Sequence, residues 1–307
     1  MRRHGIARAI LAGEFVSTFR PSNQHRRASL DGMRSGGMMR RVGDMRTIYG
    51  SHAAIAPFRL LRPARVEDAA AALADGGVCL AGGIDLVPAM RAGRRVDSVV
   101  YLGGIAALKS IERSASALGI GAGVTYAQLA GDAAIATALP DLAAVWRGVA
   151  NVRVRRAATI GGNVMAGNPQ YDMLPALMAL DAKLVFAGAN GRLETADAAS
   201  ASWPGGVLAF VEIPLAPARR FVFERGYKPV ISVAACAAGP MARIAIGCAY
   251  ERPVCRSIAL DGEAAALADA VVRDLPEPLS DWIASGAYRR KLARTLIARQ
   301  LRALGRP

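Results

Sequence analysis

The sequence predicts an α+β protein of about two domains, or three small ones, because strands and helices alternate in its first part and strands precede helices in its last part. The first part contains a β-α-β pattern from Phe58 to Leu102 with a Gly-Gly turn after its second strand. A proline-bearing stretch from Pro214 to Pro217 predicts a domain boundary. With 307 residues, 53% of them hydrophobic and 21% charged, the chain is long and apolar enough to bury a sizeable core.

Residues 53–216 are expected to form the first domain. Phe58 begins a short strand that Pro63 ends, and a helix over Val66–Ala74 follows with two acidic residues in its first turn, where negative charge interacts favourably with the helix dipole. Further strands are expected at 78–81, 98–102, 117–123, 183–186 and 206–213. Further helices are expected at 84–91, 126–129, 142–149 and 175–180.

Residues 217–307 are expected to form a smaller second domain. Strands at 230–238 and 242–249 flank a Gly239-Pro240 turn, and after Pro253 only helices are expected, at 264–273 and from Ser280 to about Leu304. The arginines of the last helix are expected to form a stripe that faces solvent or a partner rather than a nucleic acid. These arginines are Arg289, Arg290, Arg294, Arg299 and Arg302.

The formal charge of +15 is unevenly distributed along the chain. Residues 1–50 contain ten arginines and three acidic residues and lack a steady hydrophobic period. We expect residues 1–52 to be a disordered extension, or the product of a start codon assigned too far upstream. The rest of the chain is only moderately basic, so we expect no nucleic-acid partner. No apolar run approaches the roughly 18 residues that a membrane-spanning helix needs, so no membrane span is expected.

The histidines and cysteines exclude several kinds of catalytic site. The three histidines are His4, His25 and His52, so the remaining chain has none for a Ser–His–Asp triad, a zinc site of the HExxH type or a histidine-linked flavin. The four cysteines form no CxxC pair, which argues against an iron–sulfur cluster or structural zinc held by this chain alone. We expect them to be reduced, mostly buried thiols of a cytoplasmic protein.

Two Gly-Gly segments are the strongest candidates for a binding site. Gly82-Gly83 and Gly161-Gly162 are each expected to form a turn after an apolar strand. Such turns expose successive backbone N–H groups with no Cβ nearby, and a following helix N-terminus adds positive potential, so they can bind phosphate oxygens. Each segment alone could be an ordinary tight turn, because glycine is common in strained turns. Two together suit a pyrophosphate held from both sides.

Two further motifs have competing interpretations. Residues 119–123 read Gly-Ile-Gly-Ala-Gly but depart from the GxGxxG spacing, because Val124 occupies the place of the third glycine. A doubly wound dinucleotide-binding fold is therefore disfavoured. Asp172 precedes an expected helix, so it either caps that helix or accepts hydrogen bonds from cofactor hydroxyls.

The chain resembles the FAD-binding subunit of the molybdenum hydroxylases, which include xanthine dehydrogenase and the medium subunit of carbon monoxide dehydrogenase. The resemblance extends from about Pro57 to Leu304. It rests on Leu80-Ala-Gly-Gly-x-Asp-Leu, on Thr159-Ile-Gly-Gly-Asn, and on Pro169, Asp172 and Pro175 behind them. Weaker matches are Arg62-Pro63, Gly121-Ala-Gly-Val-Thr125, Val211-Glu-Ile-Pro214, Ser280-Asp281 and Tyr288-Arg-Arg290.

This resemblance implies a two-lobed FAD-binding domain of the type shared with vanillyl-alcohol oxidase (PCMH type), followed by a small C-terminal α+β domain of the carbon monoxide dehydrogenase flavoprotein type. By position, residues 80–86 would form the pyrophosphate loop and residues 159–163 a second loop near pyrophosphate and flavin. Asp172 would hold the adenosine side, and Leu208 would pack on the isoalloxazine or the adenine. The implied cofactor-binding residues are Leu80, Ala81, Gly82, Gly83, Ile84, Asp85, Leu86, Thr125, Thr159, Ile160, Gly161, Gly162, Asn163, Asp172 and Leu208.

Three positions depart from the family pattern. Ile84 replaces the usual Thr, Ser or Gln, so one side-chain contact to phosphate is missing. Arg156 stands where the family commonly has Asn. Glu224 falls near a position where relatives often carry a lysine beside the flavin, and a carboxylate there would not stabilise an anionic reduced flavin. Lys228 or Arg225 could supply the positive charge instead.

The resemblance implies an electron-transfer subunit with non-covalent FAD and no catalytic acid, base or metal ligand of its own. A [2Fe–2S] small subunit would supply electrons, a large subunit would carry the molybdenum–molybdopterin cofactor, and NAD, oxygen or a quinone would accept the electrons. The three chains would form a heterotrimer or its dimer. One alternative is a self-contained flavin reductase or oxidase of the same fold. The other is a basic binding protein with a vestigial FAD fold.

Overall fold

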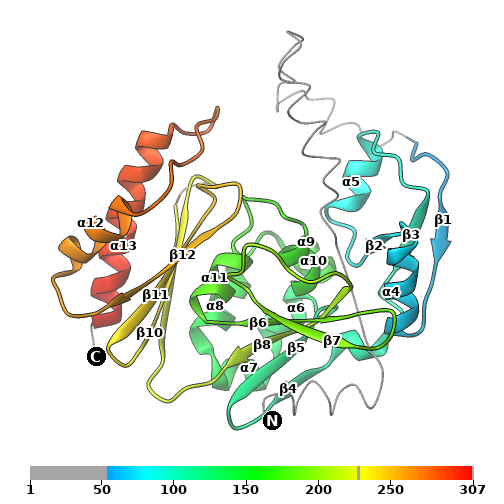
Figure 1. Ribbon diagram of the computed structural model, residues 1–307, viewed down its shortest axis with the longest axis horizontal. Coiled ribbons are helices and arrows are strands. Elements are labelled where there is room, and N and C mark those ends of the chain that lie inside the picture. Colours follow the sequence, from blue (N-terminus) through cyan, green and yellow to red (C-terminus); the bar gives the residue numbers. More distant parts are fainter. Residues whose placement is uncertain (1–53, 227–228, 306–307) are drawn as a thin grey trace.

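The computed structural model describes residues 54–226 and 229–305 (Figure 1). The extension expected at residues 1–52 lies outside these ranges, as does Lys228. The strands of the described residues form three sheets of three, five and four strands. The sheets follow one another along the chain, apart from the helices that connect and cover them (Figure 1).

The first sheet is parallel and has the order β1-β3-β2. Helices α4 and α5 form its two crossovers. The elements are β1 (Arg59–Leu61), α4 (Val66–Ala74), β2 (Val78–Leu80), α5 (Leu86–Arg91) and β3 (Ser98–Tyr101). Val66, Ala69 and Ala70 of α4 are buried in a hydrophobic cluster that also contains residues of the second sheet. The β-α-β pattern expected from the sequence is therefore present.

The second sheet is antiparallel, with the order β4-β5-β8-β6-β7. Its strands are β4 (Ile111–Arg113), β5 (Ala117–Gly121), β6 (Lys183–Ala187), β7 (Leu193–Asp197) and β8 (Val207–Pro214), with the short helix η2 (Ala106–Lys109) before them. Six helices connect β5 to β6, and all of them except α9 bury residues in a core that they share with this sheet (Figure 1). They are α6 (Tyr126–Gly131), α7 (Ala133–Ala138), α8 (Pro140–Gly148), α9 (Val152–Ala157), α10 (Ile160–Met165) and α11 (Met173–Ala179).

The third sheet is antiparallel, with the order β12-β11-β10-β9. Its elements are β9 (Arg220–Arg225), β10 (Ser232–Ala238), β11 (Met241–Gly247), β12 (Val254–Ala259), α12 (Ala264–Arg273) and α13 (Gly286–Gly305). Alternate residues of β10 pack in different hydrophobic clusters, because successive side chains of a strand point to opposite faces of the sheet. Val233 and Ala235 pack in the cluster with α12 and α13, whereas Ala234 and Cys236 belong to the cluster with α11. The sheet thus lies between α11 and the last two helices (Figure 1).

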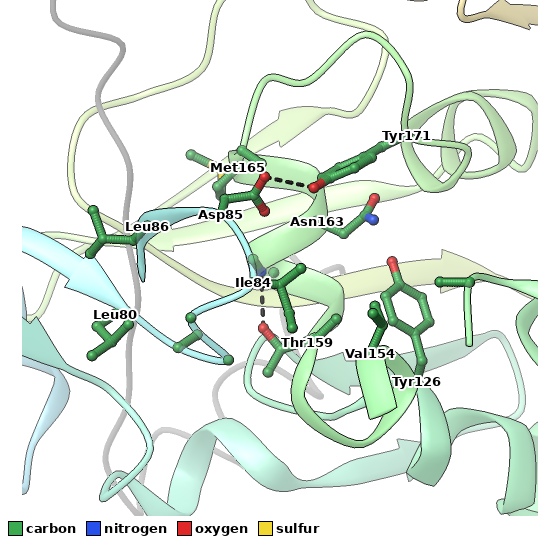
Figure 2. Close-up of a pocket in the computed structure, with 18 of the residues that line it drawn as sticks. Leu80, Ile84, Asp85, Leu86, Tyr126, Val154, Thr159, Asn163, Met165 and Tyr171 are labelled. Atoms are coloured by element: carbon green, nitrogen blue, oxygen red, sulfur yellow. Dashed lines mark hydrogen bonds between the residues drawn. The ribbon is translucent and has the colours of Figure 1, made fainter. Parts of the chain in front are cut away.

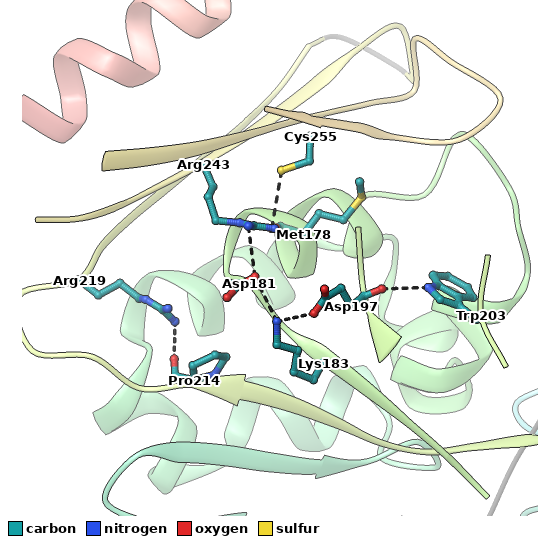
Figure 3. A network of polar contacts seen from close by, with 9 residues as sticks. All are labelled: Met178, Asp181, Lys183, Asp197, Trp203, Pro214, Arg219, Arg243 and Cys255. Atoms are coloured by element: carbon teal, nitrogen blue, oxygen red, sulfur yellow. Dashed lines mark hydrogen bonds and ion pairs between the residues drawn. The ribbon is translucent and has the colours of Figure 1, made fainter. Parts of the chain in front are cut away.

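Polar contacts fasten the third sheet to the end of α11 (Figure 3). Arg243 of β11 donates from Nε to the Met178 carbonyl at 3.1 Å and forms an ion pair with Asp181 at 3.2 Å. The Cys255 thiol of β12 lies 3.8 Å from the same carbonyl. Asp181 has a φ of 57° and also pairs with Lys183, the first residue of β6. The turn from α11 into the second sheet is therefore held by the third sheet.

Three sequence-based expectations about the elements are wrong. Residues 159–163 do not form a turn after an apolar strand, because α9 precedes them and Thr159 begins α10. The segment 254–259 is the strand β12, which pairs with β11, rather than part of a helical region. The last helix begins at Gly286 instead of Ser280, because Asp281 and Ser280 accept hydrogen bonds from backbone N–H groups in preceding turns. The predicted boundary between residues 216 and 217 falls between β8 and β9 and stays a prediction.

The arginines of α13 form only part of the stripe that the sequence predicts to face solvent or a partner. Arg294, Arg299 and Arg302 are exposed, whereas Arg290 is half-buried and Arg289 is buried. Arg289 is only 1% exposed and donates to both carboxylate oxygens of Asp281 and to the Cys248 carbonyl. Three others pair with acidic residues of the same chain: Arg290 with Glu277, Arg294 with Asp269 and Arg299 with Glu224. Intramolecular pairs thus take up four of the five arginines.

We predict that Arg289→Met lowers the free energy of unfolding by about 2–3 kcal/mol, because the substitution leaves the Cys248 carbonyl and the Asp281 carboxylate without their charged donor. Arg294→Met, on the same helix, is the control. It breaks a solvent-exposed pair with Asp269 and is expected to cost much less. Urea unfolding followed by circular dichroism measures both variants. Equal losses would contradict the structural role of Arg289.

Candidate functional site

A cavity of about 580 Å³ opens between the first sheet and helices α9 and α10. Most of its walls come from three segments: residues 78–86 around the end of β2, residues 158–166 around α10, and residues 170–172 before α11 (Figure 2). Ligand-binding cavities in proteins typically measure about 300–1,000 Å³. Both Gly-Gly segments line this cavity, so the structure brings together the two motifs that the sequence singled out.

The first glycine segment is fixed by contact with the backbone of α9. A Cβ on Gly82 would lie 1.8 Å from the carbonyl oxygen of Ala157, a distance that no side chain tolerates. Gly83 has a φ of 73°, in the left-handed region that favours glycine. The first glycine therefore permits a close approach of two backbone segments, and the second permits the turn into α5.

The second glycine segment is the first turn of α10. The Thr159 hydroxyl accepts a hydrogen bond from Gly162 N–H at 3.0 Å and caps the helix. Gly161 donates to the Ala122 carbonyl at 2.9 Å, and its added Cβ would lie 2.6 Å from the Ala122 Cβ. A Cβ on Gly162, in contrast, would meet Thr159 Oγ1 at 3.0 Å and, across the cavity wall, Ala81 Cβ at 4.0 Å. Gly161 thus serves packing, whereas Gly162 keeps space open beside the first segment.

A hydrogen bond connects the first glycine segment to the loop before α11. The Tyr171 hydroxyl donates to Asp85 Oδ1 at 2.6 Å (Figure 2). Burial, followed by the hydrogen bond to Asp85 and its charge, raises the pKa of Tyr171 well above its ordinary value. Tyr171 is therefore protonated at neutral pH, as a hydrogen-bond donor to Asp85 must be.

Asp172 lies beside Tyr171 and contacts the third sheet. Its carboxylate is 7% exposed and forms an ion pair with Arg225 at 2.9 Å. Burial raises the pKa of Asp172, and the Arg225 guanidinium opposes this shift. The Cys248 thiol lies 3.7 Å from the carboxylate, and burial followed by the charge of Asp172 raises the pKa of Cys248 to about 12. Asp172 occupies the cap position of α11 without capping it, so the capping interpretation is wrong.

Two buried polar atoms of the wall have no hydrogen-bond partner among the described residues. They are the Tyr126 hydroxyl and Asn163 Oδ1, and both residues line the cavity (Figure 2). Leaving such atoms unpaired costs about 1–3 kcal/mol each, so their presence indicates a polar ligand. These atoms, the open space at Gly162 and the size of the cavity fit a large nucleotide such as FAD.

Twelve of the fifteen residues expected to bind the cofactor line this cavity. They are Leu80, Ala81, Gly82, Gly83, Ile84, Asp85, Leu86, Thr159, Gly161, Gly162, Asn163 and Asp172. The other three lie outside its lining. Thr125 caps α6, while Ile160 and Leu208 are fully buried in the main core. Leu208 pairs with Phe186 inside the second sheet, so it has no free face against which a ring could pack.

Several lining residues were missed by the sequence-based reasoning, notably Arg94, Tyr126, Ala150 and Tyr171. Ala150 has a φ of 46°, and the Arg155 guanidinium holds the turn by donating to the Val149 and Ala150 carbonyls at 2.9 and 2.7 Å. The sequence around Ala150 does not predict the hydrogen bonds of Arg155, because these bonds depend on how α8 packs against α9.

The structure shows the surroundings of Ile84 and Glu224, two of the residues that depart from the family pattern. Ile84 lines the cavity, so an aliphatic side chain stands where relatives carry a polar one. Glu224 does not line it. The Glu224 carboxylate instead pairs with Arg299 and accepts from Gln300 at 2.7 Å. Successive strand residues face opposite sides, so its neighbour Arg225 reaches the cavity, where Arg94 is a second lining cation.

The described residues contain no cluster of three or more His, Cys, Asp or Glu side chains that could hold a metal ion. All four cysteines are free, with Cys236 and Cys248 buried and Cys79 and Cys255 partly buried. Within the same two described ranges, no helix has the length and apolar character needed to cross a membrane.

Comparison with known proteins agrees with this site. Residues 56–200 match a family model described as the FAD binding domain in molybdopterin dehydrogenase. The chain is 31% identical over 137 residues to the nicotine 6-hydroxylase medium subunit of Paenarthrobacter nicotinovorans, a match covering 44% of this chain and 48% of that protein. It is 27% identical over 278 residues to the carbon monoxide dehydrogenase medium chain of Afipia carboxidovorans, covering 78% and 93% respectively. The match to the nicotine 6-hydroxylase chain, like the matches to three further curated relatives, spans about half the length of the relative.

Solved structures show the same fold over nearly their full length. A reconstituted CO dehydrogenase from Oligotropha carboxidovorans superposes with a TM-score of 0.74 at 26% identity, covering 83% of this chain and all of that one. Quinoline 2-oxidoreductase from Pseudomonas putida 86 gives a TM-score of 0.71 at 27% identity, covering 82% and 98%. Residues 56–200 are thus a FAD-binding domain of the molybdopterin dehydrogenase type. The relatives that match are subunits of oxidoreductases, and the chain is similar to them beyond this domain as well, since the carbon monoxide dehydrogenase medium chain matches 78% of it.

Substitutions at the two glycines of α10 should distinguish a glycine needed for the packing of the chain from a glycine that leaves room for the ligand. Gly162→Ala is expected to lower FAD affinity about tenfold, or about 1.4 kcal/mol, and to cost less stability in the FAD-free chain than Gly161→Ala, because its Cβ meets only the Thr159 hydroxyl, at 3.0 Å. Gly161→Ala is expected to lower that stability by about 1–3 kcal/mol, because its Cβ meets Ala122. Quenching of flavin fluorescence measures affinity, and urea unfolding measures stability. Wild-type affinity in the Gly162→Ala variant would contradict the assignment of this space to the cofactor.

Proposed function

We propose that this chain is the FAD-binding electron-transfer subunit of a molybdenum hydroxylase. In this role it takes electrons from a [2Fe–2S] partner and passes them to NAD, oxygen or a quinone. One observation carries the proposal: within the domain that matches the FAD-binding family model, both glycine segments line one nucleotide-sized cavity, together with two buried polar atoms that have no hydrogen-bond partner among the described residues.

The bound flavin would supply the redox chemistry, since FAD can exchange electrons singly or in pairs. The residues of this chain would bind and orient it. The Tyr126 hydroxyl and Asn163 Oδ1 offer hydrogen bonds, Gly162 leaves space, and the Asp85–Tyr171 bond holds two walls together. Arg225 provides positive charge at the third sheet. We expect non-covalent binding, because the described residues include no histidine to which a flavin could be linked.

We assign the iron–sulfur and molybdenum cofactors to separate chains. The present sequence has no CxxC pair, and relatives such as the nicotine 6-hydroxylase and carbon monoxide dehydrogenase chains are named medium subunits, which supports a complex of at least three chains. The simplest assembly is a heterotrimer with a [2Fe–2S] small subunit and a molybdopterin-containing large subunit, or a dimer of it. We place the complex in the cytoplasm, where four free thiols stay reduced.

Co-purification tests this function directly. The full chain, tagged in its native host, is expected to bring down two further chains, one FAD per complex, iron, and molybdenum. Addition of a substrate of the large subunit should then bleach the flavin absorbance near 450 nm through the iron–sulfur centres.

Two outcomes would overturn the proposal. A monomeric, iron-free protein that turns over a small substrate alone would favour a self-contained flavin oxidoreductase. A chain that retains no FAD after reconstitution would favour a binding protein with a vestigial FAD fold.

A further inference from the structure

Arg94 lines the cavity that contains both glycine segments, and it is half-buried there. Its guanidinium forms no ion pair and no side-chain hydrogen bond with any residue in the described ranges 54–226 and 229–305. A half-buried arginine has lost part of its hydration, so an unpaired one in the wall of a binding cavity indicates an anionic ligand.

A Schellman motif at the end of α5 holds Arg94 beside the cavity. Gly93 has a φ of 101° and donates to the Met90 carbonyl at 3.0 Å, and the Arg94 N–H donates to the Ala89 carbonyl at 2.9 Å. The chain thereby turns back along α5, so that Arg94 lies next to Ala89, which also lines the cavity. The Ala89 N–H in turn donates to the Asp85 carbonyl at 3.1 Å. Backbone hydrogen bonds thus connect Arg94 to the start of the helix that follows the first glycine segment.

The charges of the cavity wall leave Arg94 as its unpaired cation. The charged residues of the lining are Asp85, Arg94, Asp172 and Arg225. Arg225 is already paired with Asp172 at 2.9 Å, and Asp85 accepts a hydrogen bond from the neutral Tyr171 hydroxyl at 2.6 Å. Without Arg94, the pyrophosphate of FAD would therefore meet two carboxylates and only one cation, whose charge is already compensated.

The first glycine segment does not supply this charge. Ile84 lines the cavity with an aliphatic side chain, and the glycines offer only neutral backbone N–H donors. A guanidinium adds a full positive charge and parallel N–H donors whose geometry matches two phosphate oxygens. Such charge-assisted hydrogen bonds are roughly twice as strong as neutral ones. Arg94 thus has the unpaired positive charge that the rest of the lining lacks.

We propose that Arg94 is the residue that binds the pyrophosphate of FAD through charge, in addition to the backbone N–H groups of the two glycine segments. The inference rests on the proposed function, because it takes FAD as the ligand of this cavity. Arg94 loses no partner among the described residues when it binds the phosphates, so its charge contributes to FAD affinity and not to the stability of the FAD-free chain.

The test compares two neighbouring arginines in the full chain. Arg94→Gln removes the charge and is expected to weaken FAD binding about tenfold or more. Arg95→Gln is the matched control, because Arg95 is exposed and does not line the cavity, and it is expected to change the affinity less than about twofold. Quenching of flavin fluorescence measures the affinity. Urea unfolding of both FAD-free variants should have the midpoint of the wild-type chain. Arg94→Lys keeps the charge without the paired N–H groups, so its affinity should lie between those of wild type and Arg94→Gln.

Two further measurements identify the part of FAD that Arg94 contacts. Raising KCl from about 50 mM to about 500 mM screens a contact between charges, so the difference in affinity between wild type and Arg94→Gln should become smaller. ADP and adenosine are then used as competitors of FAD. Arg94→Gln should raise the inhibition constant of ADP about as much as the dissociation constant of FAD, and it should leave that of uncharged adenosine unchanged.

Equal FAD affinity in wild type and Arg94→Gln, or equal losses in Arg94→Gln and Arg95→Gln, would overturn the inference. An equal weakening of ADP and adenosine would also overturn it, because Arg94 would then contact the adenosine instead of the phosphates. A wild-type chain that binds no FAD would overturn both the inference and the proposed function. A chain that binds FAD through Arg94 but purifies without iron and molybdenum would contradict the proposed function alone.

Discussion

The site depends on contacts between backbone segments that leave no room for a side chain. Gly82 packs directly against the Ala157 carbonyl, and Gly161 packs against Ala122 while donating a hydrogen bond to its carbonyl. Any Cβ at these two positions would push the walls apart. The spacing between the first sheet and the helical layer, and with it the width of the cavity, is set by these contacts.

Other contacts extend this constraint to the rest of the chain. A bridge between Thr125 and Thr159 fixes the start of α10 against the end of β5, and the Asp85–Tyr171 hydrogen bond joins the first glycine segment to the loop before α11. The Asp172–Arg225 pair then reaches the third sheet, whose strand β11 is fastened to the end of α11. The first sheet, the helical layer and the third sheet thus contribute to a single site. Arg225 comes from a part of the chain more than fifty residues away from Asp172.

The sequence predicted those helices and turns whose formation depends on residues close together in the chain. The helices at Val66–Ala74 and Ala264–Arg273 match in full, because apolar spacing and terminal residues define them. Both glycine segments were identified because glycine reports a backbone requirement directly. The sequence did not show that the second segment is the first turn of a helix. The short, arginine-rich stretch of α9 before it resembles a loop, and the cap formed by Thr159 is not evident from the sequence. Leu208 and Arg289 were misplaced because their burial is decided by strand pairing and by Asp281, which sequence periodicity does not report.

The glycines that line the site have two different roles. Gly82 and Gly161 build the frame, and Gly162 leaves the space that a ligand would fill. A crystal structure of the full chain grown with FAD is the most direct measurement of this claim. We expect the pyrophosphate to lie between residues 82–84 and Gly162, with its oxygens within hydrogen-bond distance of the backbone N–H groups of both segments. A pyrophosphate bound elsewhere, with both glycine segments free of the cofactor, would contradict the account.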